Sequence, residues 1–224
     1  MIQITEQPEP SHFDKKVRQP GLVFLRECPK PRPKDWSKHD YWRKISDDLY
    51  ERYKGICAYT GMMFITRRGK SANNNSDNAH RSVDHFRPKS RCPLLAYEWN
   101  NYRLTTQKTN RHKADDDNII DPFLVQPEWF NLDIPTCLIK AGTNVSDEER
   151  SQIEYTINVL KLNDDDEYVA NRHDILCLYI NQEIPLEDLT AKYPFIASEL
   201  QRQNLTDIAT LNTRFKTLPQ ATSL

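Results

Sequence analysis

The spacing of apolar residues predicts helices on both sides of a short β-rich centre. Between residues 35 and 54, Trp42, Ile45, Leu49 and Tyr53 recur at three- and four-residue steps, which is the spacing of one face of an amphipathic helix. An aromatic stripe at this spacing more often packs in a core than stacks on nucleic acid. We therefore expect a helix here whose stripe faces inward.

The last third of the chain has the same helical pattern. Ser146 is followed three residues later by Glu149, the arrangement of a capping box at a helix N-terminus. Further helices are expected near residues 165–180, 186–201 and 204–216. The stretch from Thr136 to Ile139 has the character of one more strand, and the tail after Pro219 is expected to fray.

The first 33 residues contain six prolines and few periodic apolar positions. Because proline interrupts both helices and central strands, this part is expected to be an extended arm with a short strand at residues 21–25.

The centre of the chain alternates short strand patterns with polar stretches. Residues 56–65 suggest a hairpin with Gly61 near its turn, and the polar residues 67–82 suggest a loop whose basic side chains contact a nucleic-acid backbone. Val83 and Phe86 flank an Asp-His pair, as expected for a short strand, and Pro88 would end that strand.

A second strand is expected at residues 102–104, followed by a helix through Lys113. Either Thr105 or Thr106 is suited to be the N-cap of that helix.

Together these patterns predict an α+β fold in which a small ββα core is embedded in a mostly α-helical single domain. The expected division is an N-terminal arm at residues 1–34, a helix plus the core at 35–125, and a helical region at 126–224. That last region would pack on the core or dock a partner.

Charge is distributed unevenly along the 224 residues, although the net charge is only −1. From Arg67 to Lys113 there are eleven Lys or Arg and three acidic residues. A local excess of this kind attracts phosphates. The five cysteines include no CxxC pair, so we expect free thiols. Neither a membrane-length apolar run nor a signal-peptide core is present, which makes the cytoplasm the expected compartment.

The chemistry-bearing residues gather around the central strands. Asp84 and His85 adjoin in sequence, and Asn110 and Lys113 share one face of the expected helix. One carboxylate and one amide oxygen suit a hard cation that keeps several waters. His85 is placed to take a proton from an attacking water, and Lys113 to contact a phosphate as a point charge.

The run from VDHFRPKS to NNYRLTTQKTNRHK resembles the HNH, or ββα-metal, nuclease motif in its His-Asn-Asn form: His85, Asn101 and Asn110. The resemblance implies that His85 is the general base and that Asp84 and Asn110 bind a single Mg²⁺ or Mn²⁺. It also implies that Asn101 braces the loop holding His85. With CAYTG at 57–61, the run is similar to HNH proteins of Septu and related retron anti-phage systems, which act beside an ATPase partner.

The chain departs from many HNH proteins at the four places where two cysteine pairs would hold a structural zinc. Here these places are Cys57, Thr60, Thr106 and Thr109, and one thiolate cannot form a tetrahedral zinc site. No structural zinc is expected, and packing must hold the motif.

The resulting hypothesis is a metal-dependent endonuclease that cleaves DNA, with RNA or transfer RNA as the other substrate class. The basic residues expected to contact nucleic acid are Arg87, Lys89, Arg103, Lys108 and Arg111. The alternative is an inactive HNH fold that binds nucleic acid or docks a partner. A phosphatase has little support, because the sequence has neither a second carboxylate cluster nor a phosphate-binding glycine loop.

Overall fold

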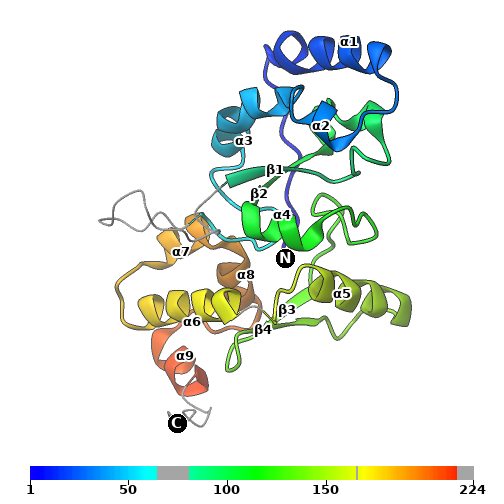
Figure 1. Cartoon of the computed structure of the whole chain (residues 1–224). Coiled ribbons are helices and arrows are strands. Elements are labelled where there is room, and N and C mark those ends of the chain that lie inside the picture. Colours follow the sequence, from blue (N-terminus) through cyan, green and yellow to red (C-terminus); the bar gives the residue numbers. More distant parts are fainter. Residues whose placement is uncertain (65–80, 165, 216–224) are drawn as a thin grey trace. The chain divides into compact units, whose positions relative to one another are not determined.

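A computed structural model of the chain describes residues 1–64, 81–164 and 166–215 (Figure 1). The chain forms two compact units. The N-terminal unit comprises Ile4–Tyr59 and Met63–Leu124, and the C-terminal unit comprises Met1–Gln3, Thr60–Met62 and Val125–Leu224. Most of the loop expected at 67–82, and the tail after Pro219, lie outside the described residues.

The centre of the N-terminal unit is a two-stranded antiparallel hairpin followed by a helix. Strand β1 (Arg81–His85) pairs with β2 (Tyr102–Thr106), so that Asp84 lies opposite Arg103 and His85 opposite Tyr102. Helix α4 (Gln107–Lys113) follows β2 without a loop. Of the two threonines suited to cap it, Thr106 does so by accepting a hydrogen bond from the Thr109 backbone N–H at 3.1 Å.

The segment that begins at Ile56 has little regular pairing. The hairpin expected at 56–65 is reduced to a single bridge between Ile56 and Met63. Between these two residues, the Ala58 N–H donates to the Leu104 carbonyl at 2.8 Å, so this part of the chain lies along β2. Every residue of β2 is buried. Strand β2 is therefore covered. Burial is possible because Leu104, Thr105 and Thr106 have apolar or hydroxyl-bearing side chains.

The expected extended arm at the N-terminus is wrong for residues 14–27, which are helical, whereas residues 1–10 form neither helix nor strand. A π-helical turn, η1 (Asp14–Arg18), leads into α1 (Gln19–Glu27), and Pro20 stands at the start of α1. A proline ring displaces the usual hydrogen-bonding pattern of the preceding turn, and a π-helical turn accommodates it. Phe13, Val17 and Phe24 are buried, so packing of one face outweighs the prolines, and no strand forms at 21–25.

The helix expected at 35–54 is interrupted. Its parts are α2 (Pro33–Trp36), the 3₁₀ turn η2 (Tyr41–Ile45) and α3 (Ser46–Arg52). The apolar stripe is buried at Ile45 and Leu49, as expected, and Trp36 packs edge-on against Phe24 of α1 at 5.7 Å between ring centroids. Two further 3₁₀ turns, η4 (Pro93–Leu95) and η5 (Trp99–Asn101), lie in the connection between β1 and β2.

The C-terminal unit contains a second hairpin, β3 (Phe130–Asp133) and β4 (Leu138–Ala141), and five described helices. These are α5 (Asp147–Val159), α6 (Asp166–Ile180), α7 (Leu186–Lys192), α8 (Pro194–Arg202) and α9 (Ile208–Phe215). The single helix expected at 186–201 is two helices, because Pro194 begins a new one.

The predicted capping box of α5 is present: Ser146 Oγ accepts from the Glu149 N–H, and Glu149 accepts from the Ser146 N–H. The mixture of two small antiparallel sheets with many helices confirms the predicted α+β class. None of the helices within the described ranges is long and apolar enough to cross a membrane.

One close packing contact in the N-terminal unit gives a test of the fold. A Cβ atom added at Gly21 of α1 would lie 2.1 Å from Cγ of the buried Tyr97 ring. We expect Gly21→Ala to lower the free energy of unfolding by about 1–3 kcal/mol, as overpacking of a core does. Urea unfolding measures this. Gln19→Ala, at an exposed position of the same helix, is the control and should change stability little; equal stability of both variants would contradict the packing.

Candidate active site

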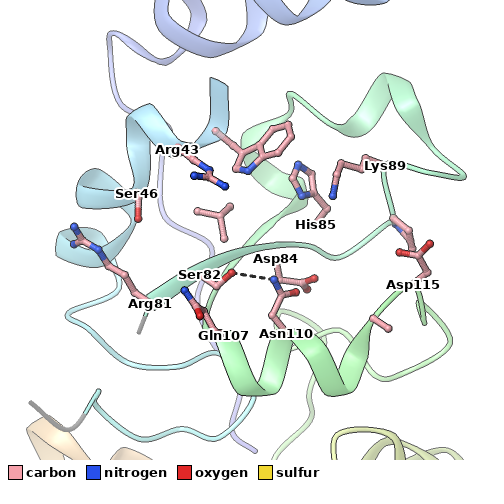
Figure 2. Close-up of a pocket in the computed structure, with 14 residues that line it drawn as sticks. Arg43, Ser46, Arg81, Ser82, Asp84, His85, Lys89, Gln107, Asn110 and Asp115 are labelled. Carbon is pink, nitrogen blue, oxygen red and sulfur yellow. Dashed lines mark hydrogen bonds between the residues drawn. The ribbon is translucent and has the colours of Figure 1, made fainter. Parts of the chain in front are cut away.

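A cavity of about 650 Å³ lies in the N-terminal unit beside the end of β1 (Figure 2). Its walls come from η2 and α3, from β1 and the loop that follows it, and from α4 and the residues after it. The lining residues are Trp42, Arg43, Ser46, Arg81, Ser82, Val83, Asp84, His85, Pro88, Lys89, Gln107, Asn110, Ala114 and Asp115. Three residues singled out from the sequence, Asp84, His85 and Asn110, thus share one cavity.

Asp84 is a buried carboxylate held from two sides. Its Oδ1 accepts from the Lys113 ammonium at 3.2 Å, and its Oδ2 accepts a hydrogen bond from the Tyr59 hydroxyl. Its side chain is only 3% exposed. Burial raises the pKa of Asp84, while the Lys113 charge and the Tyr59 hydroxyl oppose that rise. Each carboxylate oxygen has a second lone pair, so these bonds leave acceptor capacity toward the cavity.

His85 is held in one orientation by a hydrogen bond and two aromatic rings. Its Nε2 lies 3.0 Å from the Ala96 carbonyl oxygen. Because a carbonyl only accepts, Nε2 carries the hydrogen and Nδ1 keeps the basic lone pair. The Trp42 and Tyr102 rings pack edge-on against the imidazole at 4.7 and 5.2 Å between centroids. Burial, with help from the Lys89 charge, lowers the pKa of His85 to about 3, so the imidazole is neutral at physiological pH.

Asn101 ties together the loop between β1 and η5. Its Oδ1 accepts from the Arg87 N–H at 2.8 Å, and its Nδ2 donates to the carbonyls of Arg87 and Leu95, each at 3.0 Å. Its own carbonyl accepts from the Phe86 N–H at 2.9 Å. These bonds fix both ends of the loop that carries Ala96, the residue that holds the imidazole.

Asn110 joins α4 to β1. Its Nδ2 donates to the Ser82 hydroxyl at 2.9 Å, the contact drawn in Figure 2. The amide Oδ1 is then the atom suited to bind a cation. Among the described residues, no group of three or more His, Cys, Asp or Glu gathers at one point. A cation here would have one carboxylate, one amide and several waters, a set that fits Mg²⁺ better than zinc.

Lys113 does not take the position expected for a phosphate contact. It is 1% exposed, is not part of the cavity lining, and donates to Asp84 and to the His85 carbonyl, both at 3.2 Å. The last turn of α4 directs its side chain beneath β1, where the Asp84 charge attracts it. In this structure Lys113 is an internal counter-ion.

The five basic residues expected to contact nucleic acid fall into three groups. Lys89 lines the cavity, and burial lowers its pKa. Arg87, Lys108 and Arg111 are at least partly exposed outside the lining, and Arg87 pairs with Asp117 at 3.1 Å.

Arg103 is a correction to that set. It is 3% exposed, binds Asp121 through two hydrogen bonds of 2.9 and 2.6 Å, and lies 3.5 Å from the Phe123 ring centroid. Its position on a buried strand directs it inward. It supports the fold and is not available to a nucleic acid.

Sequence reasoning overlooked several residues of the site. The sequence predicts Tyr59 only as part of the CAYTG run and Trp42 only as part of the core stripe. In the structure, Tyr59 donates a hydrogen bond to Asp84, and the Trp42 ring packs against His85. Arg43 also lines the cavity. Asp115 accepts a hydrogen bond from Ser90 at 2.7 Å and lines the cavity. Asp115 lies close to the motif in sequence, whereas Trp42 and Arg43 lie far before it, and no local pattern indicates their place in the site.

At the positions where related motifs would hold zinc, hydroxyl groups make hydrogen bonds. The Thr106 and Thr109 hydroxyls lie 2.9 Å apart, and the Cys57 sulfur lies 3.6 Å from the Thr105 hydroxyl. All four side chains are buried.

Comparison with models of known protein families gave no match, and comparison with curated proteins gave none either. The function of the protein is therefore inferred from the geometry of the site and from the motif.

The bonds of Asn101 give a test of the site. We expect Asn101→Ala to lower the free energy of unfolding by about 1–3 kcal/mol, because backbone groups of the loop lose their partners. The neighbouring Asn100→Ala, at an exposed position, should have little effect. Chemical denaturation of both variants measures the difference, and a loss as large for Asn100→Ala would argue against a specific brace.

Proposed function

We propose that this protein is a metal-dependent endonuclease of the HNH kind, which hydrolyses phosphodiester bonds of nucleic acid. The observation that carries the proposal is the joint position of Asp84, His85 and Asn110 on one cavity, built from a β-hairpin and the helix that follows it. The sequence resemblance implies roles for these three residues and for Asn101, which lies outside the lining and braces the neighbouring loop.

His85 has the features of a general base. The Ala96 carbonyl holds its Nε2 hydrogen, so Nδ1 is the atom that would take a proton from water. The low pKa keeps the imidazole unprotonated but makes it a weak base in the free protein. The negative charge of a bound phosphate would raise that pKa toward the range of an effective base. The hydroxide formed in this way would attack phosphorus, and the 3′ oxygen would leave. Magnesium or manganese, when bound by Asp84 and Asn110, supplies stabilisation of the charge that develops on the phosphate and the leaving oxygen.

The charge of the cavity suits a nucleic-acid backbone. Arg43, Arg81 and Lys89 belong to its lining, and they come from three separate segments of the N-terminal unit. Phosphate contacts of this kind position a backbone without reading its sequence. DNA is the favoured substrate of the proposal, and RNA is the second.

One observation favours the alternative of an inactive module that binds nucleic acid or a partner. Both oxygens of Asp84 already have protein partners, and His85 is only 6% exposed. Such a module would bind nucleic acid equally well with and without His85, and neither form would cut. A defence role beside an ATPase partner rests on the sequence resemblance, and the assay below, repeated with a co-purified partner, tests it.

The direct test is nicking of supercoiled plasmid in the presence of Mg²⁺ or Mn²⁺. Wild-type protein should cut, and His85→Ala should lose about 10²–10⁴-fold in rate, the contribution typical of a general base. His112→Ala is the matched control, since His112 is on α4 but not in the cavity lining, and it should keep its activity.

Cleavage by His85→Ala at the wild-type rate would exclude His85 as the base. Absence of cutting by wild-type protein on plasmid, on transfer RNA and with a co-purified partner would favour the inactive module. Equal nucleic-acid binding by wild type and His85→Ala would then support the inactive binding module.

A further inference from the structure

The carboxylate at the centre of the site is already neutralised inside the protein. The Lys113 ammonium lies 3.2 Å from Asp84 Oδ1, and the exposed fractions of the two side chains are 0% and 3%. A second bond, to the His85 carbonyl, fixes the ammonium in place. A lysine buried to this degree has no route to water without opening the packing between α4 and β1. It is therefore a permanent neighbour of Asp84.

The other charges on the described lining of the cavity do not restore a negative potential. Arg43, Arg81 and Lys89 are basic, whereas Asp84 and Asp115 are acidic. Arg43 and Arg81 are paired with Asp40 and Asp47, which lie outside the lining, and Lys113 neutralises Asp84. A divalent cation that enters the free protein thus meets ligands of suitable chemistry in surroundings that carry no surplus of negative charge.

A phosphodiester supplies the negative charge that the site lacks. It adds a negative charge, which Arg43, Arg81 and Lys89 attract, and it supplies oxygen atoms of the kind that complete the shell of Mg²⁺. The cation and the phosphate each improve the site for the other.

We propose that Lys113 keeps the free protein a weak binder of divalent cations, and that cation and nucleic-acid phosphate bind together. This inference rests on the proposed function. It assigns Lys113 the role of a positioning residue that acts through Asp84. Because coupling between two ligands is reciprocal, the cation must also strengthen nucleic-acid binding by the same factor.

The test measures cation binding separately from cleavage. Mn²⁺ is titrated into His85→Ala protein with and without a short DNA duplex, and free Mn²⁺ is followed by electron paramagnetic resonance. The His85→Ala variant retains Asp84, Asn110 and Lys113 but should not cleave the DNA during the titration. The duplex should lower the dissociation constant of Mn²⁺ by about tenfold or more, within the usual range of coupling between sites. The same titration of protein that also carries Asp84→Ala measures Mn²⁺ held by DNA alone.

A second variant tests the part assigned to Lys113. In Lys113→Met protein without nucleic acid, a cation can take the place of the ammonium beside Asp84. Mn²⁺ should therefore raise the melting temperature of this variant clearly more than that of wild type. Lys38→Met removes one charge at an exposed position of the same unit, outside the cavity, and should respond as wild type does. The DNA titration does not depend on how well Lys113→Met folds.

The outcomes separate the inference from the proposed function. Equal Mn²⁺ affinity with and without duplex, in a protein whose wild type cuts plasmid, overturns the coupling and leaves the nuclease standing. The same Mn²⁺ response in Lys113→Met and Lys38→Met overturns the role of Lys113. No Mn²⁺ binding beyond the Asp84→Ala level, together with no cutting by wild type, overturns both proposals.

Discussion

The buried contact of Asp84 with Lys113 and Tyr59 joins the three segments that make the site. Tyr59 belongs to the stretch before β1, Asp84 to β1 and Lys113 to the last turn of α4. An unpaired charge buried to this extent is strongly unfavourable, and removal of one partner of such a pair typically costs about 3–5 kcal/mol. Helix α4 therefore cannot move relative to the hairpin without separating Lys113 from Asp84 and leaving a buried charge unpaired. Because His85 follows Asp84 in β1, the same contact also fixes the position of His85.

This ion pair also explains how the motif holds together although threonines occupy three of the four positions at which many HNH proteins carry zinc-binding cysteines. A structural zinc would tie the segment around Cys57 to the start of α4. Here Cys57 contacts Thr105, and Thr106 caps the helix through Thr109. Hydroxyl bonds of this kind are individually weak, about 1 kcal/mol each. They are sufficient only because the helix is anchored at its other end by Lys113.

The parts of the fold that depend on neighbouring residues could be predicted from the sequence. A cap and its partner lie three residues apart, so the Ser146 capping box could be identified and the cap of α4 could be narrowed to Thr105 or Thr106. The hairpin followed from the apolar residues around Asp84. The positions of Lys113 and Arg103 could not. Their partners, Asp84 and Asp121, are 29 and 18 residues away, and a basic residue in a basic stretch gives no sign of being turned inward. The prolines near the N-terminus predicted an extended segment, but residues 14–27 are helical because a helix buries Phe13 and Val17.

The same burial that fixes the proposed base would also limit the binding of a cation. A neutral, tightly packed imidazole is already oriented for proton transfer, but its low pKa makes it a weak base until a negatively charged ligand binds. Tight packing, however, required a counter-ion for Asp84, and that counter-ion uses part of the charge a metal would need. One carboxylate cannot fully satisfy an internal ammonium and a dication at once. The surplus negative charge must come from outside the protein, and the backbone of a nucleic acid is the source that matches the basic walls of the cavity. If the proposed function holds, the site would become complete only when nucleic acid is present, and in the free protein the proposed base would stand beside an incomplete metal site.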